Sequence, residues 1–112
     1  MVSSNSPPVS LLQDVRVLSF GSFVAGNICA LLLAELGADV VKIEARDRPE
    51  PLRAFDAPGQ EELFEPSGVR TTALWAGLTR SVRSVCLDMD SGGGRDTCQA
   101  LASLADVVIE NL

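Results

Sequence analysis

The chain has 112 residues, 46% of them hydrophobic, so it is long enough to bury one small core. Fifteen acidic against nine basic residues give a formal net charge of −6. That balance argues against a nucleic-acid partner, because nucleic-acid binding needs a basic surface. The sequence has no histidine, which excludes imidazole catalysis and histidine-ligated metal within these residues.

Three widely spaced cysteines, Cys29, Cys86 and Cys98, lie in apolar surroundings, which favours buried, reduced thiols over disulfides or a metal site. We therefore expect a cytoplasmic protein. Residues 1–10 contain neither a basic cluster nor an apolar segment, so a disordered leader is expected rather than a signal peptide. The longest apolar run, residues 28–34, is far shorter than the roughly 20 residues that a membrane-spanning helix needs, so no membrane partner is expected.

The first part of the chain predicts a strand, a turn, a helix and a second strand. Residues 15–20 are nearly all apolar, as in a strand that is buried on both faces. Residues 25–36 favour helix, and Gly37 follows where a left-handed residue commonly ends one. Residues 39–44 then form the second strand. Because open parallel sheets bind ligands at the carboxyl ends of their strands, the turn between the first strand and the helix is the leading candidate for a ligand site.

The helix is predicted to be held by tertiary packing. Burial of Leu31, Leu32, Leu33 and Leu36 should contribute about 1.5 to 3 kcal/mol each to stability. Leu32→Asp is accordingly expected to unfold the domain.

Residues 46–81 carry four prolines and many charges, which predicts a long excursion over the surface with one short helix at residues 72–78. Arginines stand near both ends of this excursion and can hold a phosphate by forked contacts. The alternative is that they are solvated charges that balance nearby acids. The two groups are Arg46, Arg48 and Arg53, and Arg80 and Arg83.

The remaining residues predict a third strand at 84–87, a glycine turn at 92–94, a helix with apolar residues at helical spacing from Cys98 to Ala105, and a fourth strand at 106–110. Asp90 or Ser91 is expected to cap this helix. The fold class is therefore α/β, a Rossmann-like open parallel sheet with flanking helices. Since no helix follows the fourth strand, residues 11–112 are expected to be the incomplete N-terminal part of a larger domain, and the chain a fragment.

The turn after the first strand contains Gly21 and Gly26, but it matches neither GxGxxG nor a phosphate loop, because Asn27 stands where the loop lysine would be. A nucleoside triphosphate site is disfavoured. The two glycines have a structural alternative, in which Gly21 ends the strand and Gly26 lets the helix pack closely on the sheet. Glu44 stands where a Rossmann fold carries its ribose-binding acid, so an NAD-type site stays open as an alternative. Asp88 and Asp90 lack a second catalytic group at fixed spacing, which favours turn and cap roles.

Six segments together resemble the class III CoA-transferases, the group that includes formyl-CoA transferase and carnitine CoA-transferase. In chain order they are LQDVRVLSF, the AG of the turn, LLAELGADVVKIE, Arg53, RSVCLDM and ADVVIENL, and the resemblance covers residues 11–112. It implies transfer of coenzyme A from an acyl-CoA to a carboxylic acid acceptor, through a CoA thioester formed on an enzyme aspartate. In the family that aspartate lies beyond Leu112, so the chain alone is expected to be inactive. The resemblance implies no metal, and it implies an interlocked homodimer for the full-length protein.

The resemblance also assigns the residues that contact CoA. Arg46 is added as a hypothesis, as the replacement for a cation that the family carries at the position of Ala45. Other departures are Asn27 for a proline, Val82 for a lysine, and the absence of the expected GD before Arg53. The assigned residues are Ser22, Val24 and Ala25 in the turn, Ala45 and Arg46 after the second strand, Leu87, Asp88, Met89 and Asp90 after the third, and Asn111 and Leu112 at the end.

Two other functions remain open at this point. The same fold and motifs serve 2-methylacyl-CoA racemases, in which a downstream acid–base pair moves an α-proton. The chain is alternatively a non-catalytic nucleotide-binding module.

Overall fold

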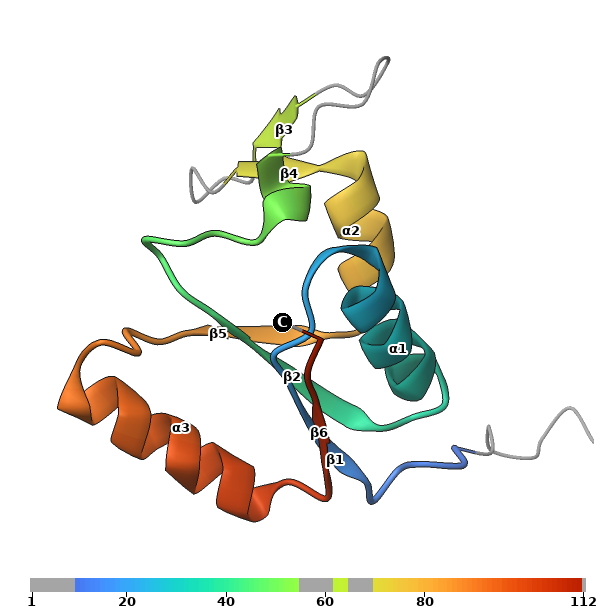
Figure 1. Ribbon diagram of the computed structural model, residues 1–112. Coiled ribbons are helices and arrows are strands. Elements are labelled where there is room, and N and C mark those ends of the chain that lie inside the picture. The colour runs from blue at the N-terminus through green and yellow to red at the C-terminus, as the bar shows by residue number, and fades with distance from the viewer. Residues whose placement is uncertain (1–9, 55–61, 65–69, 112) are drawn as a thin grey trace, which may run out of the picture.

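The computed structural model describes residues 10–54, 62–64 and 70–111. Its centre is an open sheet of four parallel strands, with α1 and α3 on opposite sides of it (Figure 1). The strands are β1 (Arg16–Ser19), β2 (Asp39–Glu44), β5 (Arg83–Cys86) and β6 (Val107–Ile109). The predicted α/β fold with a parallel sheet and flanking helices is confirmed. The predicted leader, apart from Ser10, and Leu112 lie outside the described residues.

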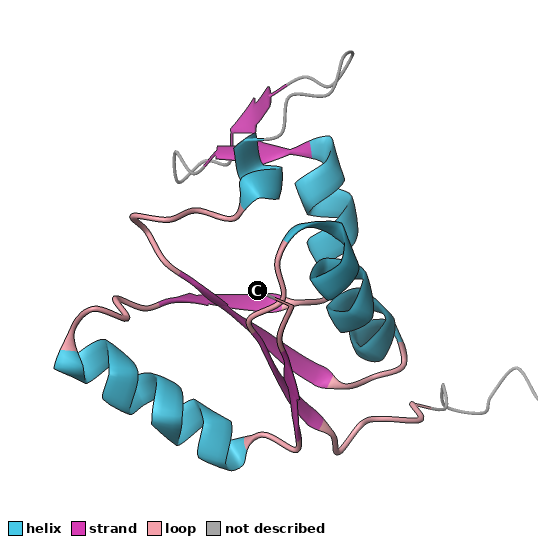
Figure 2. Ribbon diagram, in the orientation of Figure 1, coloured by secondary structure: helices cyan, strands magenta, loops and turns pink. Residues whose placement is uncertain are grey.

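The order of the strands across the sheet is β5-β2-β1-β6 (Figure 2). The chain moves from β1 to β2 and β5 on one side, then returns through α3 to place β6 on the other side of β1. Val17 faces Val40 on β2 and Val107 on β6 in these two pairings. The order therefore reverses between β1 and β6, and open α/β sheets bind ligands outside the carboxyl ends of the strands at such a switch point.

Helix α1 (Phe23–Glu35) begins two residues earlier than predicted and ends one residue earlier than predicted, with Leu36 as its C-cap. Gly37 has a φ of 102°, a left-handed conformation that a side chain would strain. Its N–H donates to Ala34 O at 2.9 Å, and the N–H of Ala38 donates to Leu33 O at 3.0 Å. This pair of bonds is a Schellman motif, which satisfies the last helical carbonyls and turns the chain into β2.

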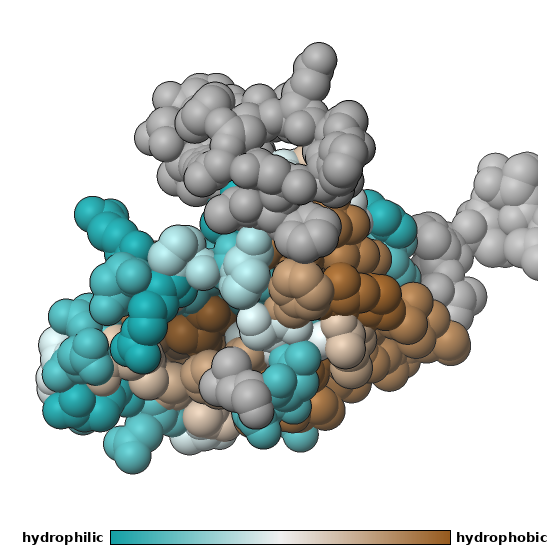
Figure 3. Space-filling view, turned by 45° about the horizontal axis from the view of Figure 1, so that its top comes forward, coloured by the Kyte–Doolittle hydropathy of each residue, from teal (hydrophilic) through white to brown (hydrophobic). Residues whose placement is uncertain are grey.

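The prediction that all four leucines of α1 are buried is wrong. Leu31 is 7% exposed, whereas Leu32 is 58% exposed and Leu36 is 45% exposed. Ala30 and Ala34, which are one helical turn apart, set the side that packs on the sheet, and Leu32 lies on the opposite side of the helix. The described chain gives no reason for Leu32→Asp to unfold it. Figure 3 shows the resulting brown surface on the α1 side of the molecule, while the α3 side is mostly teal.

The excursion after β2 has more structure than predicted. It holds a 3₁₀ turn (Pro51–Ala54), an antiparallel hairpin of β3 (Glu62–Phe64) and β4 (Arg70–Thr72), and α2 (Ala73–Thr79). Leu52, Thr72 and Trp75 are all at least 96% buried, so a small second core lies where a surface run was expected. Thr72 joins its parts, because its Oγ1 donates to Leu52 O at 2.7 Å and accepts from Trp75 N at 3.1 Å.

Ser91 caps helix α3 (Gly92–Leu104), since its Oγ accepts from Gly94 N at 2.9 Å, so the predicted Ser91 cap is confirmed. The expectation of a glycine turn at 92–94 is wrong, because these three glycines form the first turn of α3. Cys98 is buried as predicted. A space of about 270 Å³ lies between the C-terminal part of α3 and the sheet. Its lining combines apolar residues such as Leu18 and Leu101 with the charged residues Arg16, Asp39 and Arg83.

Two of the three cysteines depart from the prediction of buried thiols. Cys29 and Cys86 are exposed, and all three cysteines are free. Cys29 lies on the outward side of α1, and Cys86 ends the edge strand β5. No helix in the described ranges is both long and apolar enough to cross a membrane.

A candidate ligand site at the carboxyl edge of the sheet

The turn between β1 and α1 brings two glycines into contact. A Cβ on Gly26 would lie 2.5 Å from both Gly21 Cα and Asn111 Oδ1, and a Cβ on Gly21 would lie 2.8 Å from Gly26 Cα. Real Cβ atoms essentially never approach so closely, so both positions need glycine. The structural interpretation of these glycines is therefore confirmed: they let the start of α1 lie against the end of β1.

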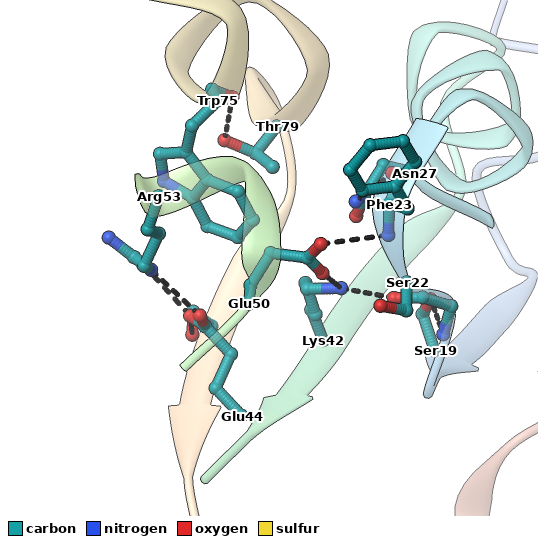
Figure 4. A network of polar contacts seen from close by, with 12 residues as sticks. Ser19, Ser22, Phe23, Asn27, Lys42, Glu44, Glu50, Arg53, Trp75 and Thr79 are labelled. Carbon is teal, nitrogen blue, oxygen red and sulfur yellow. Dashed lines mark hydrogen bonds and ion pairs between the residues drawn. The ribbon is translucent and has the colours of Figure 1, made fainter. Parts of the chain in front are cut away.

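Side chains from several elements hold the backbone of this turn (Figure 4). Ser19 Oγ accepts from Gly21 N at 3.1 Å, and Lys42 Nζ donates to Gly21 O. Glu50 Oε1 accepts from Phe23 N at 2.8 Å. Phe23 has a φ of 55°, an uncommon value for a residue with a side chain, so these contacts hold a conformation that the turn would not favour alone.

Asn111, which follows β6, closes the turn from the other side of the switch point. Its Oδ1 accepts from Ser22 N at 2.7 Å, and its Nδ2 donates to Ser22 O at 3.0 Å. Each backbone N–H of Gly21, Ser22 and Phe23 thus donates a hydrogen bond to a side-chain oxygen. A phosphate has no free amide at these three positions, and Val24 and Ala25, both exposed, are the next residues along the helix start.

The carboxyl end of β2 is tied to the excursion by Glu44. Arg53 donates to it through Nε at 2.8 Å and Nη2 at 2.9 Å, and Ser84 Oγ also donates to it. The guanidinium of Arg53 lies 4.1 Å from the centre of the Trp75 ring, which adds a cation–π contact. Since the carboxylate of Glu44 is engaged by protein donors, the alternative role as a ribose-binding acid loses support.

The pKa of Glu44 lies below its ordinary value. Burial by itself raises that pKa, because it disfavours the charged form. The hydrogen bonds from Arg53 and Ser84, together with the positive charges of Arg53 and Lys42, outweigh burial. Glu44 is therefore a fixed anion at the end of β2.

Two hollows lie outside the carboxyl ends of the strands. We call the first the strand-end hollow, of about 490 Å³, and the second the outer hollow, of about 650 Å³. The strand-end hollow is lined by Phe20, Gly21, Ser22, Lys42, Ile43, Glu44, Ala45, Arg48, Pro49, Glu50, Pro51 and Met89. The outer hollow is lined by Arg46, Asp47, Cys86, Leu87, Asp88 and Asp90.

Most of the predicted site residues gather at these hollows. Three line the strand-end hollow, four line the outer hollow, and Asn111 contacts Ser22. Val24 and Ala25 line neither hollow, and Leu112 lies outside the described residues. The three in the strand-end hollow are Ser22, Ala45 and Met89, and the four in the outer hollow are Arg46, Leu87, Asp88 and Asp90.

The two aspartates after β5 take the turn role that the sequence favoured. Asp88 Oδ1 accepts from Asp90 N at 3.0 Å, and Asp88 O accepts from Ser91 N at 3.2 Å. Asp90 Oδ2 lies 3.6 Å from Arg48 Nη2 across the mouth of the hollows. In the parts of the chain that the structure describes, no group of three or more acidic or cysteine side chains is placed to hold a metal ion.

Of the two predicted arginine groups, only Arg46 and Arg48 line the two hollows. Arg80 pairs with Glu35 at 3.3 Å and Arg83 pairs with Asp39 at 2.5 Å, both near the amino ends of β2 and β5 and so away from the hollows. Arg53 is engaged by Glu44. Arg48, which is exposed at the strand-end hollow, lies 3.8 Å from Asp47 and 3.6 Å from Asp90. Arg46, which is exposed in the outer hollow, forms no ion pair with any residue that the structure describes, so it is placed to meet an anionic ligand there.

The sequence did not single out Lys42 and Glu50, although both line the strand-end hollow. Their charged groups lie 3.0 Å apart, and each side chain is 3% exposed. A signal was present for Lys42, because it is the one charge inside the apolar run VVKI, and a buried lysine needs a partner. Glu50 had no such signal, since it lies among prolines and charges.

The sequence comparisons agree on one family. A sequence model of CoA-transferase family III matches residues 12–112. The chain is 34% identical over 110 residues to succinyl-CoA–D-citramalate CoA-transferase of Chloroflexus aurantiacus, which covers 98% of this chain and 25% of that protein. It is 36% identical over 103 residues to succinyl-CoA:mesaconate CoA-transferase of Haloarcula hispanica, covering 89% of this chain and 24% of that protein.

Solved structures give the same result. A CAIB/BAIF family protein from Brucella suis superposes with a TM-score of 0.78 at 30% identity, over 89% of this chain and 25% of that one. A hypothetical protein from Mycobacterium tuberculosis superposes with a TM-score of 0.71 at 30% identity, over 93% of this chain and 26% of that one. The chain spans about a quarter of the length of the relatives it matches. Its sequence and its fold place it in one family: the chain belongs to CoA-transferase family III.

Proposed function

We propose that the chain is the CoA-binding N-terminal portion of an acyl-CoA:carboxylate CoA-transferase. The observation that carries this proposal is the convergence of the β1–α1 turn, Ala45 after β2 and Leu87–Met89 after β5 on adjoining hollows at one edge of the sheet. The relatives named above support the reaction class, because their names describe transfer of CoA from succinyl-CoA to a carboxylic acid. An acyl-CoA and a carboxylic acid are the expected substrates, and the proposal needs no metal.

In the proposed site the residues have separate tasks. Arg46 in the outer hollow meets a phosphate of CoA, since a guanidinium binds phosphate by forked hydrogen bonds. Ala45 leaves room between the two hollows for the nucleotide. Ser22, Val24 and Ala25 place the start of α1 beside the remainder of CoA, and Asn111 holds that start in place.

The covalent chemistry belongs to another part of the full-length protein. In the class III transferases an aspartate carboxylate attacks the acyl-CoA thioester, which forms an acyl-aspartyl anhydride and releases the CoA thiolate. The thiolate then attacks the aspartyl carbonyl, which releases the donor acid and leaves an aspartyl-CoA thioester. The acceptor carboxylate takes CoA from this thioester by the same two steps in reverse, which frees the aspartate. By this resemblance the aspartate lies beyond residue 112. We therefore assign no residue of this chain to the attack, and we expect the chain alone to bind CoA without transferring it.

The full-length protein is proposed to be an interlocked homodimer in the cytoplasm. Exposed apolar side chains support further assembly, since Ile28, Leu32 and Leu36 are each more than a third exposed on α1, as is Val108 on the edge strand β6. The three free cysteines support a reducing compartment.

CoA titration followed by thermal denaturation tests the proposal, because a ligand that binds only the folded state raises its midpoint. We expect a saturable rise with CoA and a smaller one, or none, with NAD. Ala45→Glu places a negative charge and added bulk between the hollows, so it should abolish the rise. Ala76→Glu, on an exposed position of α2 outside the hollows, is the matched control and should keep it. A rise with NAD alone, or an equal CoA response in both variants, would contradict the proposed site.

A further inference from the structure

We infer that the buried Lys42–Glu50 ion pair positions the ligand-facing turn, residues 21–23, and thereby sets the affinity for CoA. This inference rests on the proposed function. It assigns to Lys42 and Glu50 the role of positioning residues, which act through the backbone of the turn rather than by touching the ligand.

The geometry places both charged groups against the turn. Lys42, in the carboxyl half of strand β2, donates through its Nζ to Gly21 O, and the same Nζ lies 3.0 Å from Glu50 Oε2. The other oxygen of Glu50, Oε1, accepts from Phe23 N at 2.8 Å. The ion pair therefore hydrogen-bonds to the carbonyl of Gly21 and to the N–H of Phe23, the residues on either side of Ser22. Figure 4 shows Glu50 between Lys42 and Phe23.

Because the ion pair is buried, its contacts restrict the conformation of the turn. Both side chains are 3% exposed, so neither charge is compensated by bulk water. A buried charge that loses its partner is strongly unfavourable, and the pair therefore resists separation. Because the pair and the turn share hydrogen bonds, a change of the turn's conformation would break contacts to both charges.

The turn needs such support, since Phe23 has a left-handed φ of 55°. That conformation is disfavoured for a residue with a Cβ and persists only where the surroundings determine it. Asn111 hydrogen-bonds to the backbone of Ser22, which lies between Gly21 and Phe23, the two residues that the ion pair contacts. Lys42 and Glu50 thus set the direction in which α1 starts, and with it the wall that Gly21 and Ser22 present to the strand-end hollow.

The test uses the 112-residue chain and replaces both charges together. Lys42→Met/Glu50→Met removes both contacts to the turn with apolar side chains of similar length, so neither charge is left buried alone. Lys42→Met/Glu50→Gln is the conservative variant, because the glutamine oxygen can again accept from Phe23 N. Asp39→Asn/Arg83→Gln is the matched control, since it neutralises an ion pair that joins β2 to β5 at the opposite, amino end of β2.

Two quantities are measured: the exchange rate of the Phe23 and Ser22 amides without ligand, and the dissociation constant for CoA by calorimetry. In the Met/Met variant we expect exchange at Phe23 to be at least tenfold faster and CoA binding at least tenfold weaker. Amides of Val17 and Val40 in the sheet should keep their protection. The glutamine variant should recover protection at Phe23 and part of the affinity, and the control should match the parent chain in both quantities.

Three results would overturn the inference. Exchange and affinity within twofold of the parent would show that the pair does not hold the turn. Faster exchange with unchanged affinity would show a purely structural pair, and weaker binding with unchanged exchange would show direct contact with the ligand. If the Met/Met variant does not fold, the glutamine variant carries the comparison, with loss of affinity expected through the missing Gly21 contact. If the parent binds no CoA, the proposed function fails, and the exchange rates alone decide whether the pair holds the turn.

Discussion

Arg53 grips Glu44 with two parallel hydrogen bonds, from Nε at 2.8 Å and from Nη2 at 2.9 Å. The side chains are 14% and 10% exposed, so this pair is largely shielded from water. It joins the carboxyl end of β2 to the 3₁₀ turn of the excursion. This bidentate ion pair therefore connects the strand-end hollow, which Glu44 lines, to the second core, where Arg53 lies against the ring of Trp75.

Glu44→Gln should lower the free energy of unfolding by about 1 to 3 kcal/mol at neutral pH, because it weakens charged hydrogen bonds from Arg53 and Ser84. The folded-state pKa of Glu44 is lowered, so its contribution is fully present above the ordinary value of 4.5 and is lost as the pH falls through the lowered pKa. Urea unfolding of parent and variant across this range measures the difference. It should be largest above pH 4.5 and shrink in acid.

The control for that experiment is Glu35→Gln, which removes one partner of the exposed pair with Arg80. Exposed pairs contribute little, so its effect should stay below about 1 kcal/mol. A difference between parent and Glu44→Gln that grows as the pH falls would contradict the assigned direction of the pKa.

Gly26→Ala should destabilise the chain by about 1 to 3 kcal/mol or more, because the new Cβ would lie 2.5 Å from Gly21 Cα and Asn111 Oδ1. Gly77→Ala in α2 is the matched control, since a Cβ there meets nothing within 4 Å. Alanine favours helix over glycine, so the control should stabilise by about 0.5 to 1 kcal/mol. Thermal or urea unfolding of both variants measures the change in the free energy of unfolding. Equal changes in the two variants would mean that the contact between Gly21 and Gly26 is less close than in the structure.

Leu31→Ala should cost about 2 to 5 kcal/mol of stability, as is usual for a buried leucine, because Leu31 is 7% exposed. Leu32→Ala, at 58% exposure on the other side of the same helix, should change stability by about 0.5 kcal/mol or less. Urea unfolding of the 112-residue chain measures both. A larger loss in the Leu32 variant would show that the outward side of α1 is covered in solution.

Arg46→Ala should weaken CoA binding by about ten- to a hundredfold, the factor that one or two charged hydrogen bonds provide. Arg80→Ala removes an equal charge that is paired with Glu35 away from the hollows, and it should leave the affinity unchanged. Calorimetry at fixed ionic strength compares the two variants. Unchanged affinity in Arg46→Ala would reject Arg46 as the replacement for the missing family cation at Ala45.

The sheet was predictable because its signals are local. Apolar runs marked every strand of the parallel sheet to within two residues, and the glycine after α1 marked its end. Ser91 marked the start of α3 for the same reason, whereas the glycines at 92–94 suggested a turn and instead begin the helix. The candidate site residues could be placed at one edge because parallel strands bring their carboxyl ends together.

The contacts that shape the site were not predictable, because they join residues far apart in sequence. The residues next to Glu50 in the sequence do not indicate that it accepts a hydrogen bond from Phe23. Those next to Arg53 do not indicate that its guanidinium lies over the ring of Trp75. The three-residue strands of the hairpin are too short to show a period. The burial of α1 failed for a different reason: the helix is apolar on nearly every side, so its pattern did not indicate which side faces the sheet.

The link between Ser22 and Asn111 also bears on how the chain folds. It joins residues 89 positions apart, and the contact of Arg16 with Asp106, at the opposite end of the β1–β6 pair, spans 90. Contacts of such long range form late, since the entropy of closing the loop is lost before they can form. The turn therefore reaches its final shape only after β6 has docked. During synthesis, Ser22 leaves the ribosome 89 residues before Asn111, so this side of the ligand site is not complete until Asn111 has followed.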